Sequence, residues 1–111
     1  MKQTTHMPPR HLSSEMRRWW RAVVNDWTLE EHHRRLLTLA CEAWDRSVQA
    51  RQQIAREGLT TPTRDGGQKL HPACRIETDC RLAFARLVRE LDLDIDPPAD
   101  ASRPPMLRSI G

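Results

Sequence analysis

Apolar residues recur at helical spacing in three stretches of the chain. In the first, they follow one another at intervals of three and four: Met16, Trp19, Trp20, Val23 and Val24. This spacing places them on one face of a helix. Ser13 is suited to cap the helix, and Glu15 lies in the first turn, where the helix dipole favours an acid. The pattern predicts a first helix over residues 14–25.

The second stretch is much longer. Thr28 and Glu31 have the spacing of a capping box, which predicts that a helix starts at Leu29. No proline or glycine follows before Gly58, which suits a left-handed C-terminal cap. A helix over residues 29–57 would be a rod of roughly 43 Å at 1.5 Å per residue. A rod of this length in so short a chain favours packing against other copies of itself.

The third stretch begins after a polar loop over residues 58–72. Asp65-Gly66 is a turn signal between threonines and polar residues, so a short β-hairpin is expected there, although Pro62 weakens its first strand. Pro72 suits the first turn of a helix, and the apolar positions that follow predict a helix over residues 73–92.

These elements predict an all-α fold of three main helices, in which the second and third form a long central helical hairpin. The expected organisation is a flexible basic arm over residues 1–12, a helical domain over 13–93, and a flexible tail over 94–111 that is acidic and proline-rich. The chain of 111 residues suits one small domain.

Composition favours an oligomer. Apolar residues make up only 38% of the chain, which is a lean core for a monomer, but four tryptophans can each bury about 150–250 Å². We therefore expect a homo-oligomer, with apolar side chains shared between the core and subunit interfaces. The residues expected to pack in this way are Trp19, Trp20, Trp27, Leu37, Trp44, Val48, Phe84 and Leu87.

Three cysteines without a CxxC pair do not form a disulfide framework, and a reducing cytosol is their natural setting. No apolar run approaches the roughly 20 residues of a membrane span, and the N-terminus has no signal-peptide pattern. The expected location is the cytoplasm, with no secretion and no membrane partner.

Charge suggests a first DNA-binding surface. Residues 1–24 carry five basic side chains against Glu15 alone, whereas residues 90–100 carry five acids and no base. A basic end suits phosphate, and an acidic end suits a protein partner. The candidate phosphate ligands near the N-terminus are Arg10, Arg17, Arg18 and Arg21. Two solvated polar surfaces would explain the same charges.

The loop offers a second DNA-binding candidate. Arg64, Lys69 and His71 surround the Gly66-Gly67 pair, so cations and backbone amides could both approach a phosphate. An ordinary surface loop explains the same residues.

Signatures of metal binding and catalysis are absent from the sequence. His71, Cys74 and Cys80 lack a fourth ligand for zinc, and Pro97 breaks the calcium-loop pattern that Asp92 begins. The glycine pair lacks the spacing of a phosphate-binding P-loop. We expect no metal, no cofactor and no enzymatic activity.

The order of several short motifs resembles the small subunits of phage terminases, in the group found in tailed phages with cohesive-end genomes. The motifs are Leu39–Trp44, Glu57–Thr60, His71–Ala73 and Leu87–Leu93, and the resemblance spans about residues 12–103. Family members often have glycine where this chain has Asp92, and a serine-rich segment where it has Asp94-Ile95-Asp96-Pro97-Pro98.

The resemblance implies a non-enzymatic component of the viral genome-packaging motor. Such subunits form rings, bind phage double-stranded DNA near the packaging start, and present it to the terminase large subunit, which holds the ATPase and nuclease. The location would then be the cytoplasm of an infected bacterial host, and the acidic tail would contact the large subunit. Two alternatives remain open, namely a dimeric helical DNA-binding transcriptional regulator and a structural connector without a DNA role.

Overall fold

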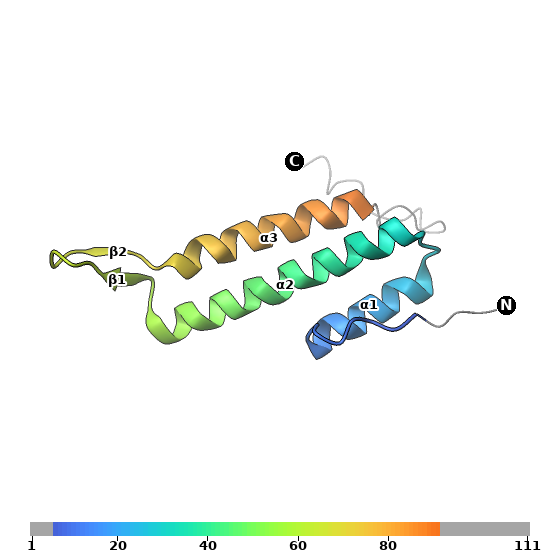
Figure 1. The fold of residues 1–111 in the computed structure, drawn as a ribbon, viewed down its shortest axis with the longest axis horizontal. Helices are drawn as coiled ribbons and strands as arrows, with labels where there is room; N and C mark the ends of the chain where they lie inside the picture. The colour runs from blue at the N-terminus through green and yellow to red at the C-terminus, as the bar shows by residue number, and fades with distance from the viewer. Residues whose placement is uncertain (1–5, 92–111) are drawn as a thin grey trace, which may run out of the picture.

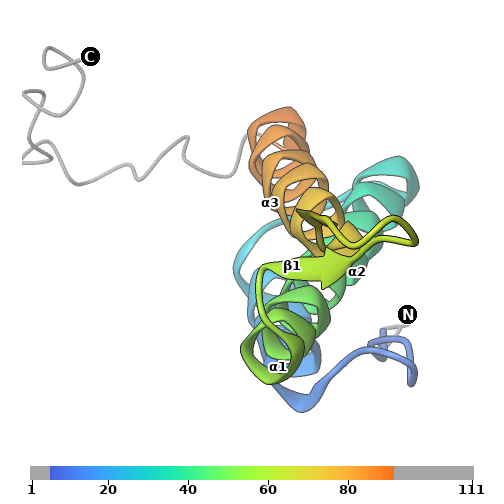
Figure 2. The ribbon, with the colours of Figure 1, turned by 90° about the vertical axis from the view of Figure 1, so that its left-hand side faces the viewer.

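The computed structural model describes residues 6–91 and confirms the mostly helical fold with three helices. Its elements in chain order are α1 (Ser14–Asp26), α2 (Glu31–Glu57), β1 (Thr60–Pro62), β2 (Gln68–Leu70) and α3 (Pro72–Leu91). Helices α2 and α3 run side by side as the predicted hairpin, and α1 lies along α2 near the end where α2 begins (Figure 1). The two strands project from the opposite end, in front of the helices in Figure 2.

Helix α1 begins where the sequence predicts. The hydroxyl oxygen of Ser13 accepts a hydrogen bond from the backbone N–H of Met16 at 3.1 Å, which caps the first turn. The Ser13 backbone N–H and hydroxyl also donate to the Asp45 carboxylate in α2, at 2.8 and 2.6 Å. The cap therefore fixes the start of α1 to the middle of α2.

The predicted start of α2 was wrong by two residues. The cap is Glu30 instead of Thr28, and the His33 ring accepts a hydrogen bond from the Glu30 backbone N–H at 3.3 Å. Trp27 and Leu29 pack against the core, and Trp27 has an extended backbone that ends α1. Because these apolar contacts fix the connection between the helices, they override the local capping signal of Thr28.

The loop forms the expected β-hairpin. Its antiparallel strands pair Thr60 with Leu70 and Pro62 with Gln68, so Pro62 lies at the end of a strand, where the missing N–H matters least. Gly58 ends α2 at the predicted position, with φ +91° and its N–H donating to the Ile54 carbonyl at 2.7 Å. Its ψ of 171° lies outside the left-handed helical region that the sequence predicts for this cap. Gly66 adopts φ +89° in the turn.

A core cluster joins all three helices at the end where α2 begins. It consists of buried side chains from the N-terminal segment, α1, α2 and the end of α3: Leu12, Met16, Trp20, Val23, Leu37, Cys41 and Leu91. Burial raises the pKa of the Cys41 thiol to about 12, with a further contribution from Asp45. The core thiol is therefore protonated and unreactive at neutral pH.

The flexible arm expected over residues 1–12 is not free as far as residue 12. Leu12 is 2% exposed and lies in the core, and the His11 ring contacts the Glu42 carboxylate at 2.7 Å. Pro8 and Pro9 favour an irregular arm, but the buried apolar side chain of Leu12 ties the end of this segment to the core. The tail over residues 94–111 lies outside the described residues.

Toward the end of α2 and the start of α3, the buried side chains of the helices are small: Ser47, Ala50 and Ala73. Small side chains allow two helix backbones to approach closely. Of the residues predicted to pack, Trp20 and Leu37 are buried, whereas the others are half-buried: Trp19, Trp27, Trp44, Val48, Phe84 and Leu87. Their remaining exposure leaves apolar surface on the single chain.

Candidate nucleic-acid interface

Helix α1 presents two arginines to solvent. Arg18 and Arg21 are exposed, and within residues 6–91 neither forms an ion pair with an acidic side chain. They are three residues apart, so they lie on neighbouring positions of one helical face. Two unpaired guanidinium groups on a rigid helix can each bind a phosphate through a planar fork of donors.

Arg17 has a different environment. Its guanidinium donates to the backbone carbonyl of Leu12 at 2.6 Å and to that of Arg10 at 3.2 Å. These bonds hold the segment that precedes α1 against the helix. The Arg10 side chain is exposed beside them, so Arg10 is the third arginine of this region that is free to meet phosphate.

The hairpin tip is less suited to an anion than its sequence suggests. The Gly66 N–H donates to the Thr63 carbonyl at 3.2 Å, and the Gly67 N–H donates to the Thr63 hydroxyl at 2.9 Å. The amides expected to bind phosphate are therefore occupied within the turn. Hydrogen bonds from the Thr63 hydroxyl and the Gly67 amide lower the pKa of the Asp65 carboxyl, which stays ionised.

Arg64 and Lys69 are both exposed at the tip, as predicted. The Asp65 carboxylate lies between them along the chain and offsets part of their positive charge. The tip therefore carries two cations with an anion between them. On α1 the nearest acid, Glu15, precedes both arginines and accepts a hydrogen bond from the Trp44 indole at 3.3 Å, so no acid lies between Arg18 and Arg21.

His71 does not belong to an exposed interface. It is 5% exposed, its Nδ1 accepts from the Ala73 backbone N–H at 3.0 Å, and its Nε2 donates to the Glu57 carboxylate at 2.6 Å. Both ring nitrogens are occupied, so we remove His71 from the DNA-binding set. The ring caps α3 and ties it to the end of α2, and we call this pair of bonds the His71 clamp.

Three aromatic side chains from three helices meet beside α1. The Phe84 ring lies 5.7 Å from the Trp19 ring and 5.1 Å from the Trp44 ring, measured between centroids. The tilted geometry is favourable for aromatic pairs. The Trp44 indole N–H also donates to the Glu15 carboxylate at 3.3 Å.

These aromatics line an open groove of about 620 Å³ between α1 and α3, which we call the aromatic groove. Its lining residues are Glu15, Met16, Arg18, Trp19, Ala22, Trp44, Phe84 and Val88. Helical periodicity predicts packing roles for the tryptophans and Phe84 but does not predict the groove, because the groove depends on how the three helices meet.

A family model described as "Phage terminase, small subunit" matches residues 14–104, which include α1, α2, the β-hairpin and α3. The chain belongs to this family. Comparisons with curated proteins and with solved structures found no match.

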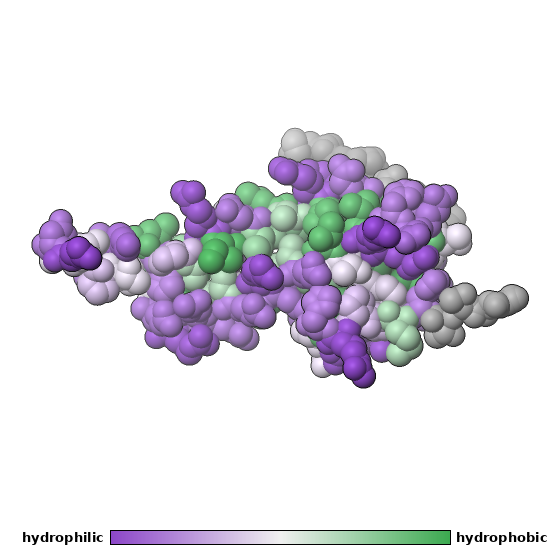
Figure 3. Space-filling view, in the orientation of Figure 1, coloured by the Kyte–Doolittle hydropathy of each residue, from purple (hydrophilic) through white to green (hydrophobic). Residues whose placement is uncertain are grey.

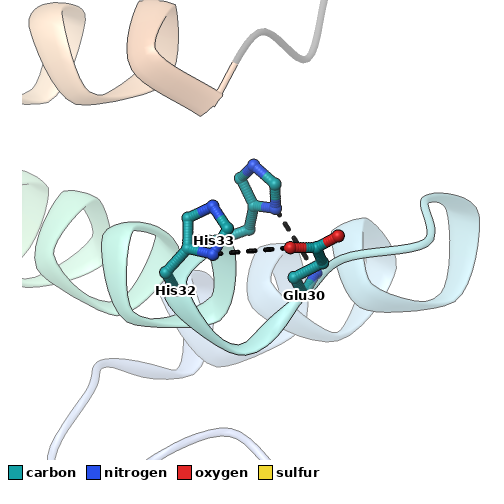
Figure 4. A group of neighbouring side chains, drawn as sticks. All are labelled: Glu30, His32 and His33. Atoms are coloured by element: carbon teal, nitrogen blue, oxygen red, sulfur yellow. Dashed lines mark hydrogen bonds and ion pairs between the residues drawn. The ribbon is translucent and has the colours of Figure 1, made fainter.

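One group of side chains in this terminase small-subunit chain has the composition of a metal site. The ligand atoms of Glu30, His32 and His33 lie within 4.8 Å of one another at the start of α2 (Figure 4). Glu30 and His33 already form the cap of α2, and the His32 ring stacks beside His33 with centroids 4.1 Å apart. Helix capping accounts for the positions of Glu30 and His33.

Proposed function

We propose that the chain is a non-enzymatic DNA-recognition component of a phage genome-packaging motor, which binds phage double-stranded DNA and delivers it to the terminase large subunit. Membership of the terminase small-subunit family carries this proposal. The charged surface of α1 supports the DNA-binding part, because Arg18 and Arg21 are exposed on a well-anchored helix.

Helix α1 is the better of the two predicted DNA surfaces. Its start is fixed to α2 through Ser13 and Asp45, so phosphate binding there would not require ordering of the backbone. The tip has occupied amides and an ionised Asp65. In our proposal Arg10, Arg18 and Arg21 make the main phosphate contacts, and Arg64 and Lys69 add weaker ones.

Assembly into a ring fits the surface of the α2–α3 hairpin. Large apolar side chains are exposed along it: Leu39, Leu59, Leu70, Ile76 and Leu82. Figure 3 shows hydrophobic residues over α3 and the middle of the molecule, with hydrophilic residues at the tip and along the lower edge. Exposed apolar side chains of this kind favour burial against a neighbouring subunit.

A dimeric transcriptional regulator fits less well. A helix-turn-helix needs a short recognition helix that can enter the major groove, whereas α2 has 27 residues and is covered along its length by α3. Native mass spectrometry separates the two readings, because a closed ring of many copies supports the terminase assembly and a dimer supports a regulator.

The salt dependence of DNA binding tests the role of α1. Binding of cohesive-end duplex DNA is measured over a range of salt concentrations for the full chain and for the R18A/R21A variant. The slope of log K against log salt is negative, and each lost phosphate contact makes it less steep by about 0.9. We therefore expect the slope of R18A/R21A to be less steep by about 1.8 for each protomer that contacts DNA.

The matched control is R86A/R89A, which removes the same charge from exposed positions on α3. We expect its slope to stay close to that of the unsubstituted chain. Equal slopes for R18A/R21A and the unsubstituted chain would refute the α1 interface. Equal decreases in both variants would show that only net charge matters.

A further inference from the structure

The aromatic groove is an apolar surface without a partner among residues 6–91. Trp19, Trp44 and Phe84 line it and are only half-buried, although each belongs to a residue type that gains much from burial. Arg18 and Glu15 are the charged residues of its lining. An apolar groove with a charged margin favours an occupant that is apolar on one side and acidic on the other.

The chain contains one segment with this pattern. Directly after α3 the sequence reads Asp92-Leu93-Asp94-Ile95-Asp96, in which acidic and apolar residues alternate strictly. In an extended backbone, alternate side chains point to opposite sides, so Leu93 and Ile95 would face one way and the aspartates the other. These five residues lie outside the described part of the structure.

The spacing of the groove matches this segment. The chain leaves α3 at Leu91, which is buried in the core and lies one turn beyond Val88. Val88 and Phe84 are four helical residues apart, which is about 6 Å. Two extended residues span about 6.6 Å, so Leu93 and Ile95 can meet Val88 and Phe84 if the chain turns back along α3.

Charge at the arginine side of the groove favours the same arrangement, whereas the Glu15 carboxylate at the other charged position of the lining is bonded to the Trp44 indole. Arg18 lines the groove, and Arg21 follows three residues later on a neighbouring position of α1. A segment lying in the groove with its apolar side inward would present Asp94 and Asp96 toward solvent and the α1 arginines. The acids would then meet Arg18 and Arg21, neither of which forms an ion pair within residues 6–91.

We propose that residues 92–96 of the same chain fold back into the aromatic groove and that their aspartates compete with DNA for Arg18 and Arg21. Docking in the groove is inferred only from the alternating apolar residues of this segment and from their spacing. The competition with DNA rests on the proposed function of α1. DNA phosphate and the acidic segment then exclude one another at the same arginines.

Phe84 is the single phenylalanine of the chain and lines the groove, so biosynthetic fluorophenylalanine gives one ¹⁹F resonance from this site. The full chain is compared with L93S/I95S, which removes the apolar anchors and keeps every charge. The control M106S/L107S makes the same chemical change farther along the tail. We expect the H₂O-to-D₂O shift of the resonance to increase in L93S/I95S and to be unchanged in the control.

An unchanged resonance in L93S/I95S overturns the docking. If the resonance is nevertheless protected from solvent, another copy or another part of the tail covers the groove. Labelled L93S/I95S is then mixed with unlabelled, unsubstituted chain to test whether the tail of a neighbouring chain can fill the groove. Restored protection of the labelled Phe84 would show docking between chains and overturn docking within one chain.

Duplex DNA then tests the competition in the same sample. When binding is verified by anisotropy, we expect the ¹⁹F resonance of the unsubstituted chain to move toward its position in L93S/I95S. A resonance that stays in place while DNA binds overturns the competition and leaves the docking intact. DNA that does not bind at all refutes the proposed function of α1 instead.

Discussion

The two ends of the α2–α3 hairpin are held together in different ways. Where α2 begins, large apolar side chains from all three helices pack together, and Leu37 and Cys41 are fully buried. Where α2 ends, the buried side chains of the helices are small, and the His71 clamp joins α2 to α3. One end depends mainly on the hydrophobic effect and the other on a few directional bonds.

The two ends therefore differ in how much free energy holds them closed and in how that free energy depends on pH. Hydrophobic packing contributes a large free energy that changes little with pH, whereas a hydrogen-bonded pair contributes less and depends on protonation. The α1 end can therefore keep a DNA-binding helix in place, while the tip end can open locally at a smaller free-energy cost. Three substitutions test this contrast.

The largest effect is expected at the α1 end. Trp20 is 4% exposed and its indole N–H donates to Thr38 at 3.2 Å, so W20A leaves a large cavity and an unpaired hydroxyl. We expect the free energy of unfolding to fall by about 3–5 kcal/mol. Denaturant titration followed by far-UV circular dichroism measures it, and L82A on the exposed side of α3 is the control that should lose little.

A smaller loss is expected at the tip end. H71A removes the cap of α3 and the bond to Glu57, which should cost about 1–2 kcal/mol. Hydrogen exchange should show faster exchange at Ala73 and Cys74 in H71A, with little change in α1. Equal acceleration throughout the chain would mean that the clamp supports the whole fold, and the contrast between the ends would fail.

The smallest effect is a change in pH dependence. Hydrogen bonds from His71 and then Gln53 lower the pKa of the Glu57 carboxyl below its ordinary value of 4.5. Since the folded pKa is the lower one, this stabilisation is present above 4.5 and is lost as the pH falls through the lowered value. We expect the difference in local stability at the tip between the unsubstituted chain and E57Q to shrink below pH 4.5, as measured by hydrogen exchange at Ala73 and Cys74 at each pH.

The control for this experiment is E31Q. The Glu31 pKa is also lowered, by the Arg35 guanidinium at 2.9 Å, but this exposed pair lies within one helix and joins no two elements. E31Q should therefore leave local exchange at the tip unchanged at every pH. If E31Q and E57Q alter that exchange equally, the clamp has no special role.

Much of the fold follows from local signals in the sequence. Ser13, Gly58 and Pro72 mark helix ends through capping and backbone geometry, which act over a few residues. The start of α2 could not be predicted in this way, because Trp27 and Leu29 are positioned by contacts with the distant core. The order of the helices follows from local signals, but the exact junction between α1 and α2 depends on tertiary packing.

The candidate site was less predictable for the same reason. Arg18 and Arg21 could be assigned from helical spacing alone, and both are exposed as expected. The role of His71 depends on Glu57, fourteen residues earlier in the chain. The aromatic groove requires Trp19, Trp44 and Phe84 to meet from three helices, and no local pattern specifies that meeting.

The β-hairpin has a consequence for protein engineering. Its turn is closed by bonds within residues 63–67, and the Thr60 hydroxyl bonds to Gln68 across the strands at 2.8 Å. At the base of the hairpin, the His71 N–H donates to the Leu59 carbonyl at 2.7 Å, and the His71 ring bonds to Glu57 at the end of α2. The tip therefore behaves as an exchangeable cassette, and a loop of equal length from another family member, or a short labelled insert, should be tolerated there while the three helices keep their packing.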